Sequence, residues 1–201
     1  MNKPKALFMA FFEKIFNLFI LNILFAISCI PVVTIFPAFI AMYSVVRDWE
    51  KNQVTEVVKP YIQAFKSNLK KGIILELQWL VMATLIYADW VFSKNLSGAI
   101  KEIDTIFLII VTTVFLMVSL FAFPIIATYK ISNKGLIVTV LKVSFKFLLT
   151  GLVMVMTAVG SGILIYLFPF CVYIIFSIYA YITYRLCNEK FKVINQVKGF
   201  V

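Results

Sequence analysis

Histidine is absent from the 201-residue chain, and charged residues make up only 14% of it. Without histidine there is no imidazole acid–base catalysis, no histidine metal ligand and no histidine to activate a serine or cysteine nucleophile. A typical soluble domain is about 25% charged, so this chain is too poor in charge to cover a water-soluble fold. We therefore expect a protein that is not an enzyme and that has neither a metal site nor a cofactor.

Arginine and cysteine are also scarce. The two arginines are Arg47 and Arg185, which leaves few groups for bidentate phosphate contacts, so the net charge of +10 does not indicate nucleic acid binding. The three cysteines have no CxxC spacing and lie in or beside apolar runs, as Cys29, Cys171 and Cys187. We expect them to be packing residues.

What the chain has in excess is apolar residues, at 63%, with a mean hydropathy of +1.00. A fold of this length cannot bury so large an apolar surplus away from water, so part of it must face lipid. The composition predicts an all-α bundle: a single integral membrane domain over residues 1–201, with five to six membrane helices and basic amphipathic surface helices.

The first apolar run, residues 15–46, has 32 residues without a charge and would be about 48 Å long as one helix. It exceeds a hydrocarbon core of about 30 Å and contains Pro31 and Pro37. We predict a helix pair with a compact turn over 31–36. A single kinked, tilted span is the alternative.

Residues 47–71 are the most polar part of the chain and combine apolar residues at helical spacing with lysines. This pattern predicts a basic amphipathic helix at the membrane surface, attracted to an anionic inner leaflet. A docking surface for a cytoplasmic partner would show the same pattern.

Four further membrane spans are predicted, over residues 72–92, 105–129, 147–166 and 168–185. A short basic amphipathic stretch, 130–146, precedes the third of these. Residues 147–184 lack any charge and are too long for one span, so the chain must turn back within them. Gly160-Ser161-Gly162 and Pro169 are the candidates for that turn.

The distribution of lysine and arginine predicts the orientation. With a helix pair in 15–46, both termini lie on the cytoplasmic side of the membrane. Seventeen of the 19 basic residues then lie on that side as well. A single span would reduce the number to 14, so the charge pattern favours the pair.

Polar residues within the apolar runs are the candidates for function. Glu76 and Asp89 are about 20 Å apart along one helix and cannot act as a carboxylate pair. An interfacial carboxylate beside a tryptophan is the simpler interpretation of each, and Gln78 lies beside Glu76. We expect Asn22 to bond across helices, and Thr34 to satisfy backbone groups freed by the proline turn.

The dipeptide Phe-Pro occurs three times, at residues 36–37, 123–124 and 168–169. The first two copies are followed by a tyrosine, a basic stretch, a Phe-Lys pair and a glycine. This order suggests a degenerate repeat with parallel halves.

One set of segments is more distinctive: Leu21–Phe25, Ile30–Ala38 with its Pro-Val-Val-Thr turn, Ala41–Tyr43 and Ala64–Asn68. These resemble the YesL family of bacterial membrane proteins, and Phe36 stands where that family usually has glycine. The residues that carry the resemblance are Asn22, Pro31, Thr34, Pro37, Tyr43, Phe65 and Lys66. The resemblance implies an accessory role in oligosaccharide uptake, with a sugar ABC permease or a second copy of the chain as partner.

Two functions of different classes remain open. The first is the non-enzymatic accessory protein implied by the resemblance. The second is a small secondary transporter or flippase, which predicts a polar cavity at mid-membrane lined by Asn22, Thr34, Glu76 or Gln78.

Overall fold

The structure is a computed structural model that describes residues 3–52, 55–129 and 133–196. These residues form seven α-helices, two short 3-10 turns and no strand, which confirms the all-α prediction. The helices are α1 (Lys3–Ser28), α2 (Ile35–Asn52), α3 (Val58–Ser93), α4 (Gly98–Thr128), α5 (Asn133–Lys146), α6 (Leu148–Leu167) and α7 (Val172–Gln196). The 3-10 turns η1 (Val32–Thr34) and η2 (Pro169–Cys171) precede α2 and α7.

Five helical segments within the described residues are long and apolar enough to cross a membrane: Val32–Lys51, Val58–Ser93, Gly98–Thr128, Leu148–Leu167 and Pro169–Phe191. Such a set is compatible with a multi-pass membrane protein. The first apolar run is divided between α1 and α2 by η1, at the place where the prolines predict a turn.

Helix α2 lies at the centre of the molecule. Its side chains from Ile40 to Val46 are all buried, as is expected of a helix that is enclosed on every side. Helices α1, α3, α4 and α7 all pack against it. Pro37 falls in its first turn, where the missing N–H has no helical partner to lose.

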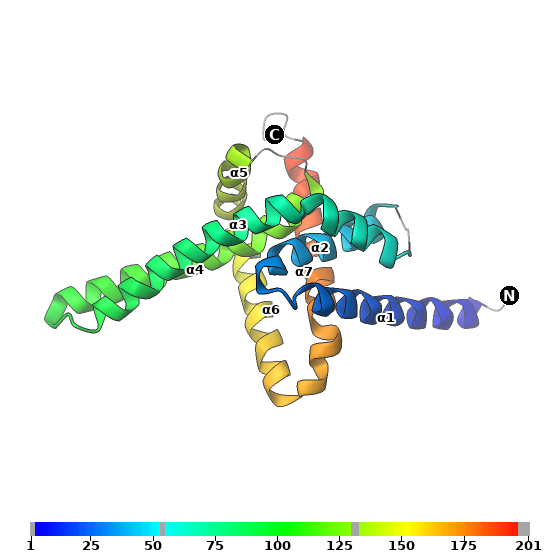
Figure 1. Ribbon diagram of the computed structural model, residues 1–201, viewed down its shortest axis with the longest axis horizontal. Helices are drawn as coiled ribbons and strands as arrows, with labels where there is room; N and C mark the ends of the chain where they lie inside the picture. The colour runs from blue at the N-terminus through cyan, green and yellow to red at the C-terminus, as the bar shows by residue number, and fades with distance from the viewer. Residues whose placement is uncertain (1–2, 53–54, 130–132, 197–201) are drawn as a thin grey trace.

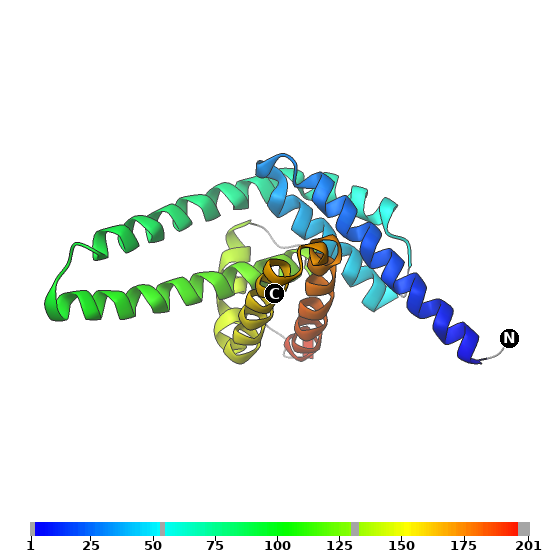
Figure 2. The same ribbon diagram turned by 90° about the horizontal axis from the view of Figure 1, so that it is seen from below.

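Two helical hairpins diverge from this centre (Figure 1). The α3–α4 hairpin extends to the left of the view, and the α6–α7 hairpin points downward. Figure 2 shows the long α3–α4 pair reaching well beyond the other helices. Most of the apolar side chains on the outer parts of both hairpins are therefore exposed, which is the expected state of surfaces that face lipid.

The extent of α3 differs from the sequence-based expectation. Residues 47–71 and 72–92 were expected to form a separate surface helix and a span. Instead α2 continues to Asn52, and a single 36-residue helix runs from Val58 to Ser93. Pro60 is compatible with this helix because it lies in the first turn, and Gly72 does not break it because it packs directly on α2.

The predicted turn at Gly160-Ser161-Gly162 is wrong, because all three residues lie inside α6. The other candidate, Pro169, is confirmed, because the chain turns at Phe168 and Pro169 opens η2. A β-carbon added at Gly160 or Gly162 would meet no atom within 4 Å, so this stretch is not a close-packing site either. Pro169 has a fixed φ and no N–H, and this is a stronger stop signal than two glycines in an apolar helix.

Two other glycines mark close helix crossings. A β-carbon at Gly72 would lie 2.6 Å from Cγ of Pro37, so α3 crosses α2 at that point with no room for a side chain. A β-carbon at Gly151 of α6 would likewise collide with the side chains of Met117 and Phe121 of α4. Small residues let membrane helices approach closely, and these two contacts set how the hairpins leave the centre.

Candidate functional site

Asn22 joins α1 to the first turns of α7. Its amide nitrogen donates to the carbonyl of Val172 at 2.8 Å, and its amide oxygen accepts from the backbone N–H of Ser177 at 3.3 Å. The side chain is only 3% exposed. Both ends of the amide are thus used to hold two helices together, as expected of a polar group in an apolar setting.

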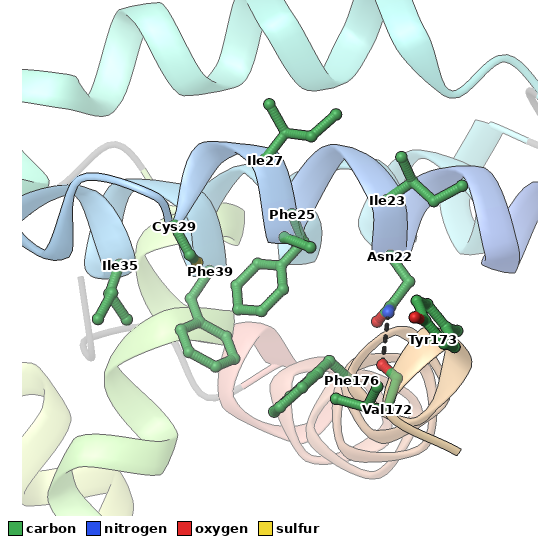
Figure 3. Close-up of a pocket in the computed structure, with 11 residues that line it drawn as sticks. Asn22, Ile23, Phe25, Ile27, Cys29, Ile35, Phe39, Val172, Tyr173 and Phe176 are labelled. Atoms are coloured by element: carbon green, nitrogen blue, oxygen red, sulfur yellow. Dashed lines mark hydrogen bonds between the residues drawn. The ribbon is translucent and has the colours of Figure 1, made fainter. Parts of the chain in front are cut away.

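An apolar groove of about 520 Å³ lies beside Asn22, between α1, the start of α2 and the start of α7 (Figure 3). Phe25, Phe39 and Phe176 point toward one another in it. Asn22 is the sole amide in its lining, and the other ten lining residues carry hydrocarbon side chains, a thiol or a phenol. Because the amide is engaged by backbone groups, the groove offers hydrocarbon contacts to a ligand.

Thr34 satisfies backbone groups of the proline turn. Its hydroxyl lies 2.6 Å from the carbonyl of Ser28 and 2.6 Å from that of Pro31. The carbonyl of Ser28 belongs to the last turn of α1, where carbonyls lack a helical donor, and the carbonyl of Pro31 also accepts the backbone N–H of Thr34 at 2.9 Å. Pro31 itself is exposed at the tip of the turn, whereas Pro37 is buried.

Glu76 caps the N-terminus of α2. One carboxylate oxygen accepts the backbone N–H of Phe36 at 3.3 Å, and the side chain is 5% exposed. The N-terminus of a helix carries free N–H groups and a partial positive charge, both of which favour a carboxylate. Phe36 is an ordinary helical residue here, so the position does not need glycine.

The other two polar candidates on α3 lie elsewhere. Gln78 is exposed and Asp89 is half-buried near the far end of the helix. The neighbouring tryptophans bond across to α4, with Trp79 donating to Ser119 at 2.8 Å and Trp90 to Thr112 at 3.2 Å. The structure therefore separates Gln78 and Asp89 from Asn22 instead of bringing the candidates together around one cavity.

Tyr43 belongs to a polar junction where α2, α4 and α7 meet. Its hydroxyl lies 2.8 Å from the hydroxyl of Thr183. Nearby, the hydroxyl of Thr128 lies 3.3 Å from the hydroxyl of Tyr184. Tyr43, Thr183 and Tyr184 are all fully buried. The partners of Tyr43 carry no sequence signal, because isolated threonines and tyrosines in an apolar helix are too common to single out.

Arg47 lies at the end of α4 near the same junction. Its guanidinium donates to the backbone carbonyl of Ala127 and pairs with Asp48 at 2.8 Å. The carbonyls at the end of a helix carry a partial negative charge, so Arg47 caps the C-terminus of α4 as Glu76 caps the N-terminus of α2. The charge of Arg47 contributed to the predicted orientation, but this role was not anticipated.

Phe123 contacts three aromatic rings of α2, one edge-on and two stacked. It lies 5.1 Å from Phe36, 5.0 Å from Phe39 and 6.1 Å from Tyr43, measured between ring centroids. Two of the three Phe-Pro dipeptides are thus in contact, whereas Phe168 is exposed at a hairpin tip. The parallel repeat stays a prediction.

Phe65 and Lys66 lie in the first half of α3. Phe65 stacks on Tyr61 with ring centroids 6.3 Å apart, and Lys66 is exposed. In the described part of the chain, no three cysteine, aspartate or glutamate side chains come together in a way that could hold a metal ion. The chemistry available at these positions is hydrogen bonding and packing between helices.

Comparison with known proteins gives a match to a family model over part of the chain. No curated protein and no solved structure matches the chain. Residues 18–90 match the model of a family described as "Protein of unknown function, DUF624", and this range contains Asn22, the proline turn, Tyr43 and Glu76.

Proposed function

We propose that this protein is a non-enzymatic accessory protein of the bacterial cytoplasmic membrane. On the strength of its resemblance to the YesL family, we assign it to oligosaccharide uptake through an ABC-type permease. The resemblance rests on residues within the range that matches the family model, from Asn22 to Lys66. Both termini lie in the cytoplasm in this proposal, as the lysine and arginine distribution predicts.

The observation that carries the proposal is how the intramembrane polar groups are used. Asn22, Thr34 and Glu76 all bond to backbone groups of neighbouring elements. A transporter would instead need such groups free to receive cargo. Of the four residues predicted to line a transport cavity, Asn22 alone borders the groove, and that groove is apolar. This geometry favours an accessory protein over a secondary transporter.

The α3–α4 hairpin supplies the surface for a membrane partner. Its outward side chains include Val81 and Leu85 of α3, which are 61% and 60% exposed. The helices of a permease could cover this side of the hairpin through close packing, which is the main attraction between helices in lipid.

Photo-crosslinking in cells tests the proposal. A photoreactive phenylalanine analogue at Leu85 should give a crosslink to a permease subunit, identified by mass spectrometry. Exposed Tyr173, on the other hairpin, is the matched control position and should give no such product. If Leu85 yields only lipid adducts or a product of twice the protein's own mass, the permease assignment is wrong.

A further inference from the structure

The first half of α3, residues 58–71, has two different faces, and we refer to this segment as the basic arm. One face packs on the protein through Tyr61, which is 2% exposed. The other face carries the exposed apolar side chains of Val58, Ile62 and Leu69. The exposed lysines Lys59, Lys66 and Lys70 lie beside them at the helical spacing expected of one continuous surface.

Two hydrogen bonds connect the chain just before the basic arm to α1 and α2. Asn17 of α1 donates to the carbonyl of Thr55 at 3.2 Å, and the indole of Trp49 donates to the carbonyl of Glu56 at 3.3 Å. Both contacts lie just before the arm begins. Figure 1 shows the arm arching over the far end of α2, away from the tips of both hairpins. These hydrogen bonds and the buried side chain of Tyr61 set which face of the arm carries the lysines outward.

Helix α5 also carries exposed apolar side chains beside an exposed lysine. Ile137, Val138 and Phe145 are exposed there, next to exposed Lys142. Helix α5 also lies away from the hairpin tips (Figure 1), and it packs against α4 and α6. The basic arm and α5 thus each pair an uncovered apolar stripe with lysine side chains.

We propose that the basic arm is a binding surface for anionic phospholipid headgroups, with α5 as a second contact. Val58, Ile62 and Leu69 would enter the boundary between acyl chains and headgroups, and the lysine ammonium groups would bind the phosphates. An acidic soluble protein would match the lysines. However, the arm continues directly into a membrane span, so the bilayer boundary is the apolar phase nearest to its exposed stripe.

Quenching of Trp49 by brominated lipids tests this proposal on the full chain. Substituting Trp79→Phe and Trp90→Phe leaves Trp49 as the single tryptophan, placed at the start of the arm. We expect brominated phosphatidylglycerol to quench it more efficiently than brominated phosphatidylcholine. Replacing both Lys59→Gln and Lys66→Gln should lower the ratio of the two lipid binding constants by about 30-fold, which is about fivefold for each lysine near an anionic surface.

Lys94→Gln with Lys101→Gln is the matched control, because it removes the same charge from the tip of the α3–α4 hairpin. The ratio should not change in this control. Equal quenching of the parent protein by both lipids would overturn the proposal and favour an acidic protein partner. A fall in the ratio of binding constants in the control as large as in the Lys59→Gln, Lys66→Gln variant would overturn it as well. Native mass spectrometry of the unsubstituted protein, counting retained phosphatidylglycerol, provides a readout that does not depend on the tryptophan substitutions.

Discussion

At the scale of single residues, the polar side chains inside the bundle bind backbone groups of other helices. Asn22 holds α7, Glu76 caps α2 and Arg47 caps α4. Helix ends leave N–H and carbonyl groups without partners, and lipid supplies none. The positions of Glu76 and Arg47 are therefore explained by free backbone groups at helix ends, whereas Asn22 links α1 to backbone groups in the first turns of α7.

Glu76→Leu should destabilise the protein more than Glu76→Gln. Leucine leaves the N–H of Phe36 without an acceptor, at a cost of about 1–3 kcal/mol in the free energy of unfolding. The glutamine oxygen can still accept that bond, so its loss should be limited to the charge–dipole part, about 0.3–1 kcal/mol. Thermal unfolding in detergent measures both. Equal effects of the two substitutions would contradict the capping role.

Tyr43→Phe and Thr183→Val should be coupled, because their hydroxyls lie 2.8 Å apart in a buried site. A double-mutant cycle should give a coupling free energy of about 0.6 kcal/mol, the average for such bonds between membrane helices. Unfolding of the two single variants and the double variant in mixed micelles provides the measurement. Strict additivity would mean that the bond contributes nothing to stability.

At the scale of elements, helix packing depends on small residues at two crossings. Gly72 lets α3 cross Pro37 of α2, and Gly151 lets α6 cross α4. Gly160 and Gly162, which attract attention in the sequence, have open space around them. The environment of a glycine, and not its spacing, decides whether it is needed.

Gly72→Ala should destabilise the protein by about 1–3 kcal/mol, since its β-carbon would lie 2.6 Å from Pro37 and would force the two helices apart. Gly160→Ala is the matched control within an apolar helix. It should be neutral, or stabilising by up to about 1 kcal/mol, because alanine is the better helix former. Melting temperatures of the two variants measure both expected changes in stability. A melting temperature for Gly72→Ala equal to that of the parent would show that the crossing is loose.

At the scale of the whole molecule, a buried central helix carries two hairpins that diverge from it (Figures 1 and 2). The distribution of basic residues predicts that the hairpin tips and the termini lie on opposite sides of the membrane. The basic arm and α5 lie away from the tips, which fits their proposed contact with the inner leaflet.

Cysteine labelling checks this orientation. In a variant whose three native cysteines are replaced by serine, Ser97→Cys at the α3–α4 tip should react with an impermeant maleimide in intact cells. Asn188→Cys near the end of α7 should react only after the cells are permeabilised. The reverse pattern would invert the predicted topology.

Composition, the prolines and the distribution of basic residues were enough to predict an all-α bundle and the division of residues 15–46 into two helices. Both predictions rest on local physics: a surplus of apolar residues, a length that exceeds one bilayer, and the missing N–H of proline. The continuity of α3 could not be predicted, because an amphipathic segment and a span have the same helical geometry and no residue between them forces a break.

Tertiary structure decided what the polar residues do. The sequence alone identified Asn22, Thr34, Glu76 and Tyr43, but it could not assign partners such as Val172 or Thr183, which lie 150 and 140 residues away from Asn22 and Tyr43. It also could not show that Gly72 is confined while Gly160 is free. The charge and apolar content of a chain determine which solvent it occupies, whereas pairing between distant helices depends on packing that no local pattern encodes.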